Sequence, residues 1–393
     1  MAILYPPFLQ QSGFSVAILG TLIALDGVGR LLSRLPAGLA YTLPRARLLT
    51  AGAMVLVFAS TALIPFAGAT WELAGLILVR AAGYGVASTI MMAIVMDLKP
   101  GSMSAGSVMG WFTSAFSLGH ALGAMLAGFL ADRAGYAATF LTLGSLPMLA
   151  LFFLIPLALA SPAASRPTSG IPRHPARAMG LSQVGLSRLR RGWEETQGLG
   201  AMVFLAALVA FYLNLMTDTL GTLFPLFALG LGLSLTTVGS IRGISSVMGI
   251  TARLLSGVIF SLLDYRKINL LTIVLLALSV ILLPSFRSVV ALGGLLSLFG
   301  VSRGLLRVSS GAMVMTEIQG GKRGTGLASG IYHAGLDLGV LAGPILGGLA
   351  AQAFGIPTTF RLLPLIFLAF IGLALLQAGR RHLVGELRAE PRQ

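Results

Sequence analysis

Three aspartates stand inside long apolar stretches of this 393-residue sequence: Asp26, Asp218 and Asp337. A charge at the centre of a membrane-spanning helix costs on the order of 2.5–3.5 kcal/mol on insertion scales, so such residues are expected to be paired or to face a cavity. An arginine partner favours the charged carboxylate, whereas burial disfavours it. Separating such a pair therefore allows a proton to bind, and we rank Asp218, Asp337 and Asp26, in that order, as candidate proton sites.

Basic and polar residues at helical spacing supply candidate partners for these carboxylates. Residues four apart lie one turn from each other on one helix face, as Asp26–Arg30, Asn214–Asp218 and His333–Asp337 do. For Asp26 and Arg30, a local neutralising pair is the alternative to a functional role. From similar depth in the chain's apolar segments, we expect Asp218 to meet Arg242, Asp337 to meet Arg303, and His333 to meet Arg307. The candidate coupling and cavity residues are Asp26, Arg30, Arg80, Asn214, Asp218, Arg242, Arg303, Arg307, His333 and Asp337.

The composition predicts an all-α integral membrane protein. Hydrophobic residues make up 56% of the chain and charged residues only 10%, against about 25% charged in soluble domains. This excludes a soluble enzyme. No cysteine is present, which excludes disulfides and thiolate metal sites, and no catalytic triad, metal site or nucleotide fingerprint can be assembled. We therefore expect no enzyme, metal or cofactor, only a proton gradient as energy source.

Eleven segments are long and apolar enough to span a bilayer, since a span needs about 20 residues. They lie at 14–41, 46–66, 71–97, 101–130, 136–160, 200–228, 234–262, 268–286, 288–317, 324–353 and 357–379. The predicted organisation is an N-terminal bundle (1–160), a Pro-, Ser- and Arg-rich linker (161–199), a C-terminal bundle (200–379) and a tail (380–393). The linker is expected to be a solvated tether.

The two bundles repeat one another. A shift of 220 positions places Gly106, Gly119, Gly135 and Thr139-Phe140 on Gly326, Gly339, Gly355 and Thr359-Phe360, and a shift of 219 places Pro6, Gly13, Gly20 and Arg34 on Pro225, Gly232, Gly239 and Arg253. This indicates parallel repeats of six helices. Because Pro225 comes late in a full span, residues 1–9 are expected to be the end of a first helix truncated to a stub.

The basic residues predict the orientation. If the linker is inside, 17 of the 27 Lys and Arg residues fall in inner loops and the tail, three in outer loops and seven in spans. Loops that retain Lys and Arg are cytoplasmic, so the linker and C-terminus are expected in the cytosol and the protein in the plasma or inner membrane. The net charge of +15 is then an orientation signal, and no nucleic-acid partner is expected.

Several motifs are candidates for conformational change. One follows the second helix, with Arg34, Gly38, Arg45 and Arg47, and its repeat copy retains Gly257 and Arg266. Glycines recur every four positions in segments 101–130 and 324–353, which leaves bare faces for close helix approach. Static packing and rocking of the two bundles are both open readings. The residues are Gly119, Gly123, Gly128, Gly339, Gly343, Pro344, Gly347 and Gly348.

These features resemble the major facilitator superfamily of secondary transporters. The Arg34–Arg47 stretch is similar to the family's signature between helices 2 and 3, although Thr42 stands where an acid is expected. Arg80 with Gly83 and Gly85 resembles the arginine–glycine motif, and Gly339-x3-Gly343-Pro344-x2-Gly347-Gly348 resembles an element of proton-coupled exporters. In the equivalent element at Gly119–Gly128 the proline is missing.

The resemblance implies alternating access, a small-molecule substrate and a lipid bilayer environment. We expect a monomer, although the sequence carries no signal for the oligomeric state. The resemblance favours export of a drug or metabolite by proton antiport. The main alternative is uptake of a small organic acid or sugar by proton symport, for which intramembrane arginines suit an anionic substrate. A non-transporting membrane receptor is a remote alternative.

Overall fold

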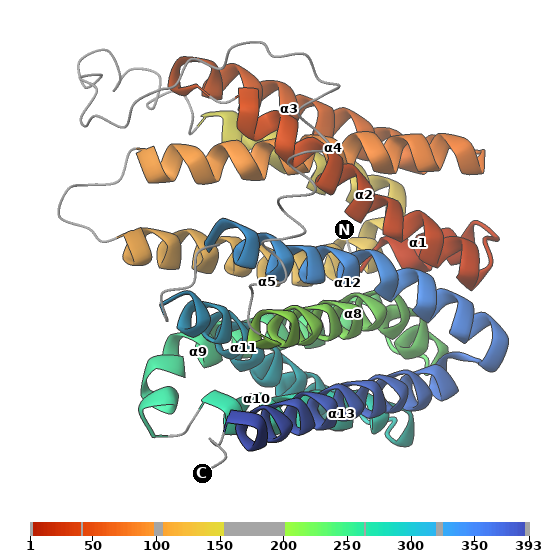
Figure 1. Cartoon of the computed structure of the whole chain (residues 1–393). Helices are drawn as coiled ribbons and strands as arrows, with labels where there is room; N and C mark the ends of the chain where they lie inside the picture. Colours follow the sequence, from red (N-terminus) through yellow and green to blue (C-terminus); the bar gives the residue numbers. More distant parts are fainter. Residues whose placement is uncertain are drawn as a thin grey trace.

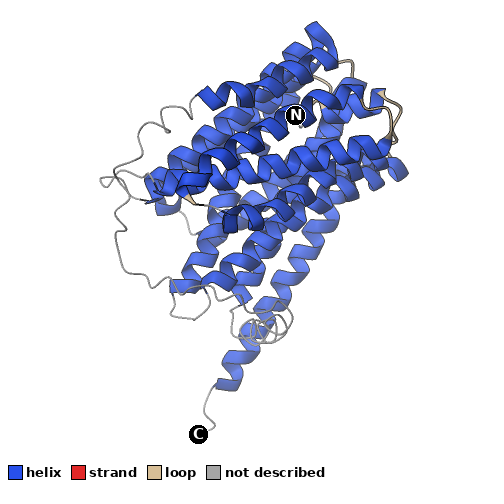
Figure 2. Cartoon of the chain, turned by 90° about the horizontal axis from the view of Figure 1, so that it is seen from above, coloured by secondary structure: helices blue, strands red, loops and turns tan. Residues whose placement is uncertain are grey.

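The computed structural model describes residues 3–40, 42–97, 105–152, 201–262, 265–319 and 325–389, and these residues are almost entirely helical. The predicted linker (161–199), the gap between the predicted spans at 98–100, and most of the gap at 318–323 lie outside this part of the chain. Figure 1 shows the N-terminal helices packed as one group and the C-terminal helices as another, and Figure 2 shows both groups running in roughly the same direction.

The N-terminal group contains short α1 (Tyr5–Gln11), α2 (Val16–Ala40), α3 (Leu43–Leu63) with the 3-10 turn η1 (Ile64–Phe66), α4 (Thr70–Asp97) and α5 (Ala105–Phe152). The C-terminal group contains α8 (Ala201–Gly230), α9 (Leu235–Leu262), α10 (Tyr265–Ile281) with η2 (Leu283–Ser285), α11 (Val289–Gln319), α12 (Thr325–Phe354) and α13 (Ile356–Ala389). Nine stretches of the described residues are long and apolar enough to cross a membrane.

Segments 101–130 and 136–160 form two helices that meet in a tight turn and share the label α5. Gly135 has φ 76° and ψ 173° inside it, so the helix axis breaks there and the chain turns back. The single stretch 114–152 among the nine therefore holds two of the predicted spans. The prediction of a short helix before the first full span is met by α1, whose residues Tyr5, Pro6, Pro7 and Leu9 are buried.

The repeat predicted from the sequence is visible in the backbone. The described glycines with left-handed φ are Gly13, Gly135, Gly232 and Gly355. They form two pairs, because Gly13 and Gly232 are 219 apart and Gly135 and Gly355 are 220 apart. Each pair makes the same turn in its own half, and this φ is one that only glycine adopts without strain.

Side-chain packing around these turns is repeated as well. Thr139 Oγ1 donates to the Gly135 carbonyl at 2.7 Å, and Thr359 Oγ1 donates to Gly355 at 2.9 Å. The next residue in each half packs on a phenylalanine of the first helix of its repeat. Ring centroids are 5.2 Å apart for Phe8–Phe140 and 5.7 Å apart for Phe227–Phe360. The two halves are thus equivalent in turn, cap and core.

The helix ends define two sides of the molecule. We call the side on which α5 ends and α8 begins the linker side; the turns at Gly13, Gly135, Gly232 and Gly355 lie on the opposite side. Phe66 and Trp71 mark the opposite side between α3 and α4, with exposed fractions of 70% and 75%. Aromatic residues of this kind concentrate at the membrane–water boundary.

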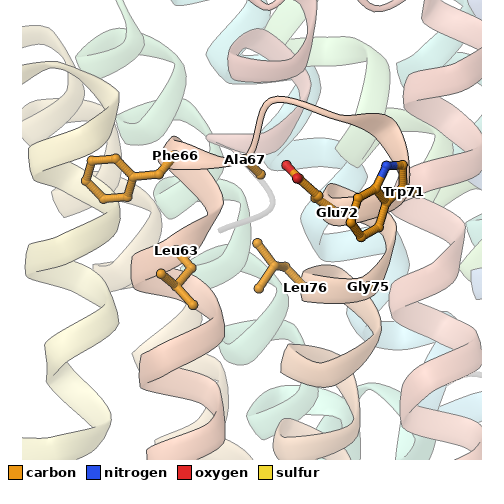
Figure 3. A pocket seen from close by; sticks show the side chains of 7 residues that line it. All are labelled: Leu63, Phe66, Ala67, Trp71, Glu72, Gly75 and Leu76. Carbon is orange, nitrogen blue, oxygen red and sulfur yellow. The ribbon is translucent and has the colours of Figure 1, made fainter.

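A shallow, largely apolar hollow of about 420 Å³ lies at this α3–α4 turn. Figure 3 shows Leu63 and Leu76 within it and the Glu72 carboxylate near the turn. Glu72 accepts hydrogen bonds from the backbone N–H groups of Gly68 and Ala69 at 2.9 and 3.1 Å, which ties down the start of α4. None of the residues lining the hollow belongs to the predicted charged site.

Replacing Gly135 by alanine should lower stability by about 1 kcal/mol or more, because a left-handed φ is strained in any residue that carries a Cβ. The measurement is the melting temperature of the purified protein in detergent. The matched control is Gly52→Ala, since Gly52 is helical and a Cβ there meets nothing within 4 Å. Equal effects of the two substitutions would contradict the assigned role of the turn.

Candidate functional site

The N-terminal half contains a buried ion cluster. Asp26 forms ion pairs with Arg30, one turn away on α2, and with Arg80 on α4. Both guanidinium groups also lie over tyrosine rings, Arg30 at 4.7 Å from the Tyr84 centroid and Arg80 at 5.2 Å from the Tyr5 centroid. The predicted Asp26–Arg30 pair is present, and Arg80 is a second partner that the sequence did not reveal. With one carboxylate and two guanidiniums, the cluster carries one surplus positive charge.

Asp218 on α8 lies among arginines from both halves. Arg242 of α9, Arg303 and Arg307 of α11, and Arg30 of α2 are all close enough to interact with it electrostatically. The predicted Asp218–Arg242 ion pair is not formed, since no side chain in the described part of the protein lies within ion-pairing distance of the Asp218 carboxylate. A further helix, α12, packs against α8 at this point. The residue of α12 beside the Cβ atom of Asp218 is Gly343, which has no side chain and therefore leaves room for the carboxylate.

Asn214, one turn before Asp218, connects three helices of the C-terminal half. Its Nδ2 donates to the Leu336 carbonyl of α12 at 2.9 Å, and its Oδ1 accepts from Arg307 Nη1 of α11 at 3.2 Å. Arg307 was predicted to face His333, and it is held by Asn214 instead. His333 itself is exposed on α12, with its ring edge-on to Tyr332 at 5.6 Å.

The predicted Asp337–Arg303 pair is wrong. Asp337 Oδ1 lies 3.5 Å from Arg34 Nη1, which belongs to α2 in the other half. The helical period explains this placement, because residues two apart point to nearly opposite sides of a helix. Gly339 of α12 packs against α8, so Asp337 faces the N-terminal half. Arg34, which we predicted as part of a conformational motif, is therefore also a cross-half contact.

The repeat partners of this contact meet in the same way. Arg253, which corresponds to Arg34, donates from Nη2 to Ser117 Oγ of α5 at 3.0 Å and from Nε to the Gly249 carbonyl at 3.1 Å. Ser117 corresponds to Asp337 at the 220 offset. Both contacts lie toward the linker side of the helices and join opposite halves. Sequence reasoning missed Ser117 and Arg253 as contacts, although the two offsets identify both.

The remaining residues of the predicted signature lie at the linker side. Gly38 is near the end of α2, while Arg45 and Arg47 lie in the first turns of α3. Thr42 precedes α3 in an extended conformation, and its side chain makes no capping hydrogen bond. In the second copy, Gly257 lies in α9 and Arg266 lies in the first turn of α10. A role for these residues in conformational change stays a prediction.

The glycine row of α12 packs within its own half. Cβ atoms at Gly335, Gly339 and Gly343 would collide with backbone carbonyls of α8, and one at Gly347 with the Thr219 side chain of the same helix. Of the two readings left open by the sequence, static close packing therefore applies to this row. On α5, Cβ atoms at Gly119 and Gly123 would meet no described atom within 4 Å, so these two glycines make no close approach to another helix in the described part of the chain.

Other glycines bring the two halves together on the side opposite the linker. A Cβ at Gly20 of α2 would collide with the Pro344 carbonyl of α12, and a Cβ at Gly348 would collide with the Val16 carbonyl. The repeat supplies the equivalent seam between α5 and α9. There, Gly128 approaches the Leu235 carbonyl and Gly239 approaches the Ala124 carbonyl.

Each seam ends in a side chain that caps a helix of the opposite half. Asp132 of α5 accepts hydrogen bonds from the backbone N–H groups of Leu235 and Thr236 at the start of α9, at 3.0 and 2.6 Å. Gln352 of α12, its counterpart at the 220 offset, accepts from the Ala17 N–H at the start of α2 at 3.0 Å. The first backbone N–H groups of a helix lack partners within it, so these caps close the side opposite the linker.

The comparisons with known proteins agree with this architecture. A family model described as Major Facilitator Superfamily matches residues 1–329. The chain therefore belongs to the major facilitator superfamily, a family of membrane transporters and not of enzymes. A search of curated protein sequences gave no match.

Solved structures of the same fold include two transporters of low sequence identity. One is a bacterial homologue of the human lysosomal transporter Spinster, in an inward-facing, unoccupied conformation, with a TM-score of 0.72, 13% identity, and coverage of 96% of this chain and 92% of the other. Another is the nucleoside transporter NupG, with a TM-score of 0.68, 14% identity, and coverage of 95% of this chain and 93% of the other. At these identities the similarity shows the fold alone.

Replacing Asp26 by asparagine should destabilise the protein by about 3 kcal/mol, because two partly buried guanidiniums lose their counter-charge. A melting curve in detergent measures the loss. Asp337→Asn is the matched control, since its pair is longer and more exposed, and it should cost under about 1 kcal/mol. In the double variant Asp26→Asn/Arg80→Met, part of the lost stability should return; no recovery would argue against a charge-based role.

Asp132→Ala should open the side opposite the linker more often, because two backbone donors lose a charged acceptor worth about 1.5–3 kcal/mol. A cysteine at Ala124, introduced into this cysteine-free chain, should react with an impermeant maleimide roughly tenfold faster in this variant. Glu72→Ala is the control, since Glu72 caps α4 within one half. An unchanged labelling rate would show that the seam holds without the cap.

Proposed function

We propose that this protein is a proton-coupled secondary transporter that moves a small organic solute by alternating access, with Asp218 as its proton-binding group. One observation carries the proposal: Asp218 stands between arginines of both halves and forms no ion pair within the described structure. A carboxylate in that position gains or loses its electrostatic partners whenever the halves move. Proton binding is thereby coupled to the change of access.

The contacts between the halves support alternating access. On the side opposite the linker, close glycine approaches and two backbone caps hold the halves together. On the linker side, the described cross-half side-chain contacts are Arg34–Asp337 and Arg253–Ser117. A transporter needs two such sets of contacts that break in turn, and the solute enters from the side where they are broken.

We further propose that the protein acts as a monomer in the plasma or inner membrane, with the linker and C-terminus in the cytosol. The excess of basic residues in the linker-side loops supports this orientation. A proton gradient would supply the energy, and no cofactor is required.

Two directions of coupling follow from the sequence. Export by proton antiport was favoured by the glycine-rich elements, and it stays a prediction. Those elements now carry less weight, since the row on α12 packs within one half. Uptake of a small organic acid by proton symport is supported by a specific observation, the surplus of arginines around Asp218.

Proton flux in proteoliposomes tests both the coupling and its direction. Vesicles containing the protein and the pH dye pyranine receive octanoate, succinate, adenosine or octylammonium from outside. An inward solute gradient acidifies the lumen through a symporter and makes it alkaline through an antiporter. Asp218→Asn should abolish the pH change while solute counterflow continues, because the exchange of bound solute needs no proton.

Asp337→Asn serves as the comparison, since Asp337 was ranked second and lies in a cross-half contact. If both variants retain the wild-type proton flux, Asp218 is not the proton site. If neither wild-type flux nor counterflow occurs with any solute of the panel, the proposal of transport fails for these classes.

A further inference from the structure

The charged residues between the two halves are strongly unbalanced. Seven arginines stand against three aspartates in this region, which leaves a surplus of four positive charges. They form one electrostatic group. Arg303 interacts with Arg242, Arg253 and Arg307, Arg30 interacts with Arg34 and Arg80, and both Arg303 and Arg30 interact with Asp218. The arginines are Arg30, Arg34, Arg80, Arg242, Arg253, Arg303 and Arg307, and the aspartates are Asp26, Asp218 and Asp337.

Partners within the protein account for only some of these arginines. Asp26 pairs with Arg30 and Arg80, and Asp337 with Arg34. Arg307 donates to Asn214, and Arg253 donates to Ser117 and a backbone carbonyl. In the described part of the chain, the guanidiniums of Arg242 and Arg303 take part in no ion pair or hydrogen bond.

Arg242 and Arg303 come from neighbouring helices, and both lie within electrostatic range of Asp218. The backbones of α9 and α11 are in close contact, because Gly300 and Gly304 would collide with carbonyls of α9 if they carried a Cβ. Arg303 Nη2 lies 3.5 Å from the position that a Cβ atom would take at Gly249 on α9. Arg242 Nη2 lies 3.4 Å from the position that a Cβ atom would take at Gly221 on α8. Two guanidiniums are thus held near Asp218 by three helices.

We propose that the transported solute is an organic anion whose carboxylate or phosphate group binds Arg242 and Arg303. This inference rests on the transport function proposed above and names its substrate class. Charged side chains within membrane-spanning helices pair with an opposite charge or face a water-filled cavity. Arg242 and Arg303 are half-buried, so an anion from solution can reach them, and Asp218 supplies one negative charge for four nearby arginines. Guanidinium groups present paired N–H donors that match carboxylate and phosphate oxygens.

The same geometry couples the anion to a proton. A bound anion takes over the arginines that stabilise the Asp218 carboxylate and places a second negative charge beside it, which favours protonation of Asp218. The charged groups that act on Asp218 are Arg30 from α2, Arg242 from α9, and Arg303 and Arg307 from α11, while α12 meets it with Gly343. Anion and proton therefore bind together, as in a symporter.

Calorimetric titration of the purified protein tests the charge preference. Octanoate, octanamide and octylammonium share an alkyl chain and differ in charge, whereas succinate and octyl phosphate separate a small acid and a lipid-like phosphate from octanoate. At least one of the three anions should bind, and the amide and the ammonium should bind at least tenfold more weakly. Binding of octylammonium or octanamide as tight as that of every anion would overturn the proposal.

Variants then locate the site. Arg242→Gln and Arg303→Gln should each weaken binding of the anion that gives the strongest signal by about tenfold or more, the size expected for a charged hydrogen bond. Arg287→Gln is the matched control, because Arg287 is exposed on the opposite side of the membrane domain. Equal binding by all three variants, with melting temperatures like that of the wild type, would place the anion elsewhere and overturn the assignment.

The dependence on pH separates this inference from the proposed function. Between about pH 6 and 9 the carboxylate probes stay ionised, so a fall in affinity with rising pH reports a proton taken up by the protein. That fall, up to tenfold per pH unit, should disappear in Asp218→Asn. Anion binding that is independent of pH in the wild type would overturn joint binding and the role of Asp218, while the anion site at Arg242 and Arg303 would stand.

Discussion

A guanidinium cannot leave water without a counter-charge, and this constraint organises the centre of the protein. In the N-terminal half it is met inside the protein, where one carboxylate, Asp26, joins α2 to α4 through Arg30 and Arg80. In the C-terminal half, Arg242 and Arg303 are half-buried, lie near a single carboxylate and, within the described residues, pair with none. Each guanidinium of the N-terminal cluster thus has a carboxylate partner in the protein, whereas we propose that an anion from solution is the partner of Arg242 and Arg303.

The backbone contacts follow a different rule, which is the repeat. Turns, aromatic pairs, glycine approaches and helix caps all occur twice, at offsets of 219 or 220. The charged residues follow the repeat only in part. Arg34 corresponds to Arg253, so this positive charge is present in both halves, whereas the negative charge of Asp337 corresponds to the neutral Ser117. The scaffold is therefore symmetric and the chemistry is asymmetric, so that moving parts are shared and binding groups belong mainly to one half.

The fold and most helix bounds could be predicted from hydropathy and the repeat, since spans of about 20 apolar residues and left-handed glycines are local properties. The end of α13 was not predicted, because the helix continues to Ala389 through the polar residues predicted as a tail. Partners across helices could not. Placing Asp337 opposite Arg303 used depth alone, whereas the rotation of α12, fixed by Gly339 and Gly343 against α8, turns Asp337 toward α2. Arg80 was predicted as a cavity residue, but its pairing with Asp26, 54 positions away, is seen only in the packing of the helices. The offsets could have revealed Asp132 and Gln352.

The two caps differ in one respect that bears on how the molecule moves. Asp132 is charged and binds two amides, whereas its counterpart Gln352 is neutral and binds one. Hydrogen bonds to a charged acceptor are roughly twice as strong as neutral ones. The two halves should then separate first at the α2–α12 contact and only afterwards at the α5–α9 contact. The opening between the halves would therefore appear first beside α2.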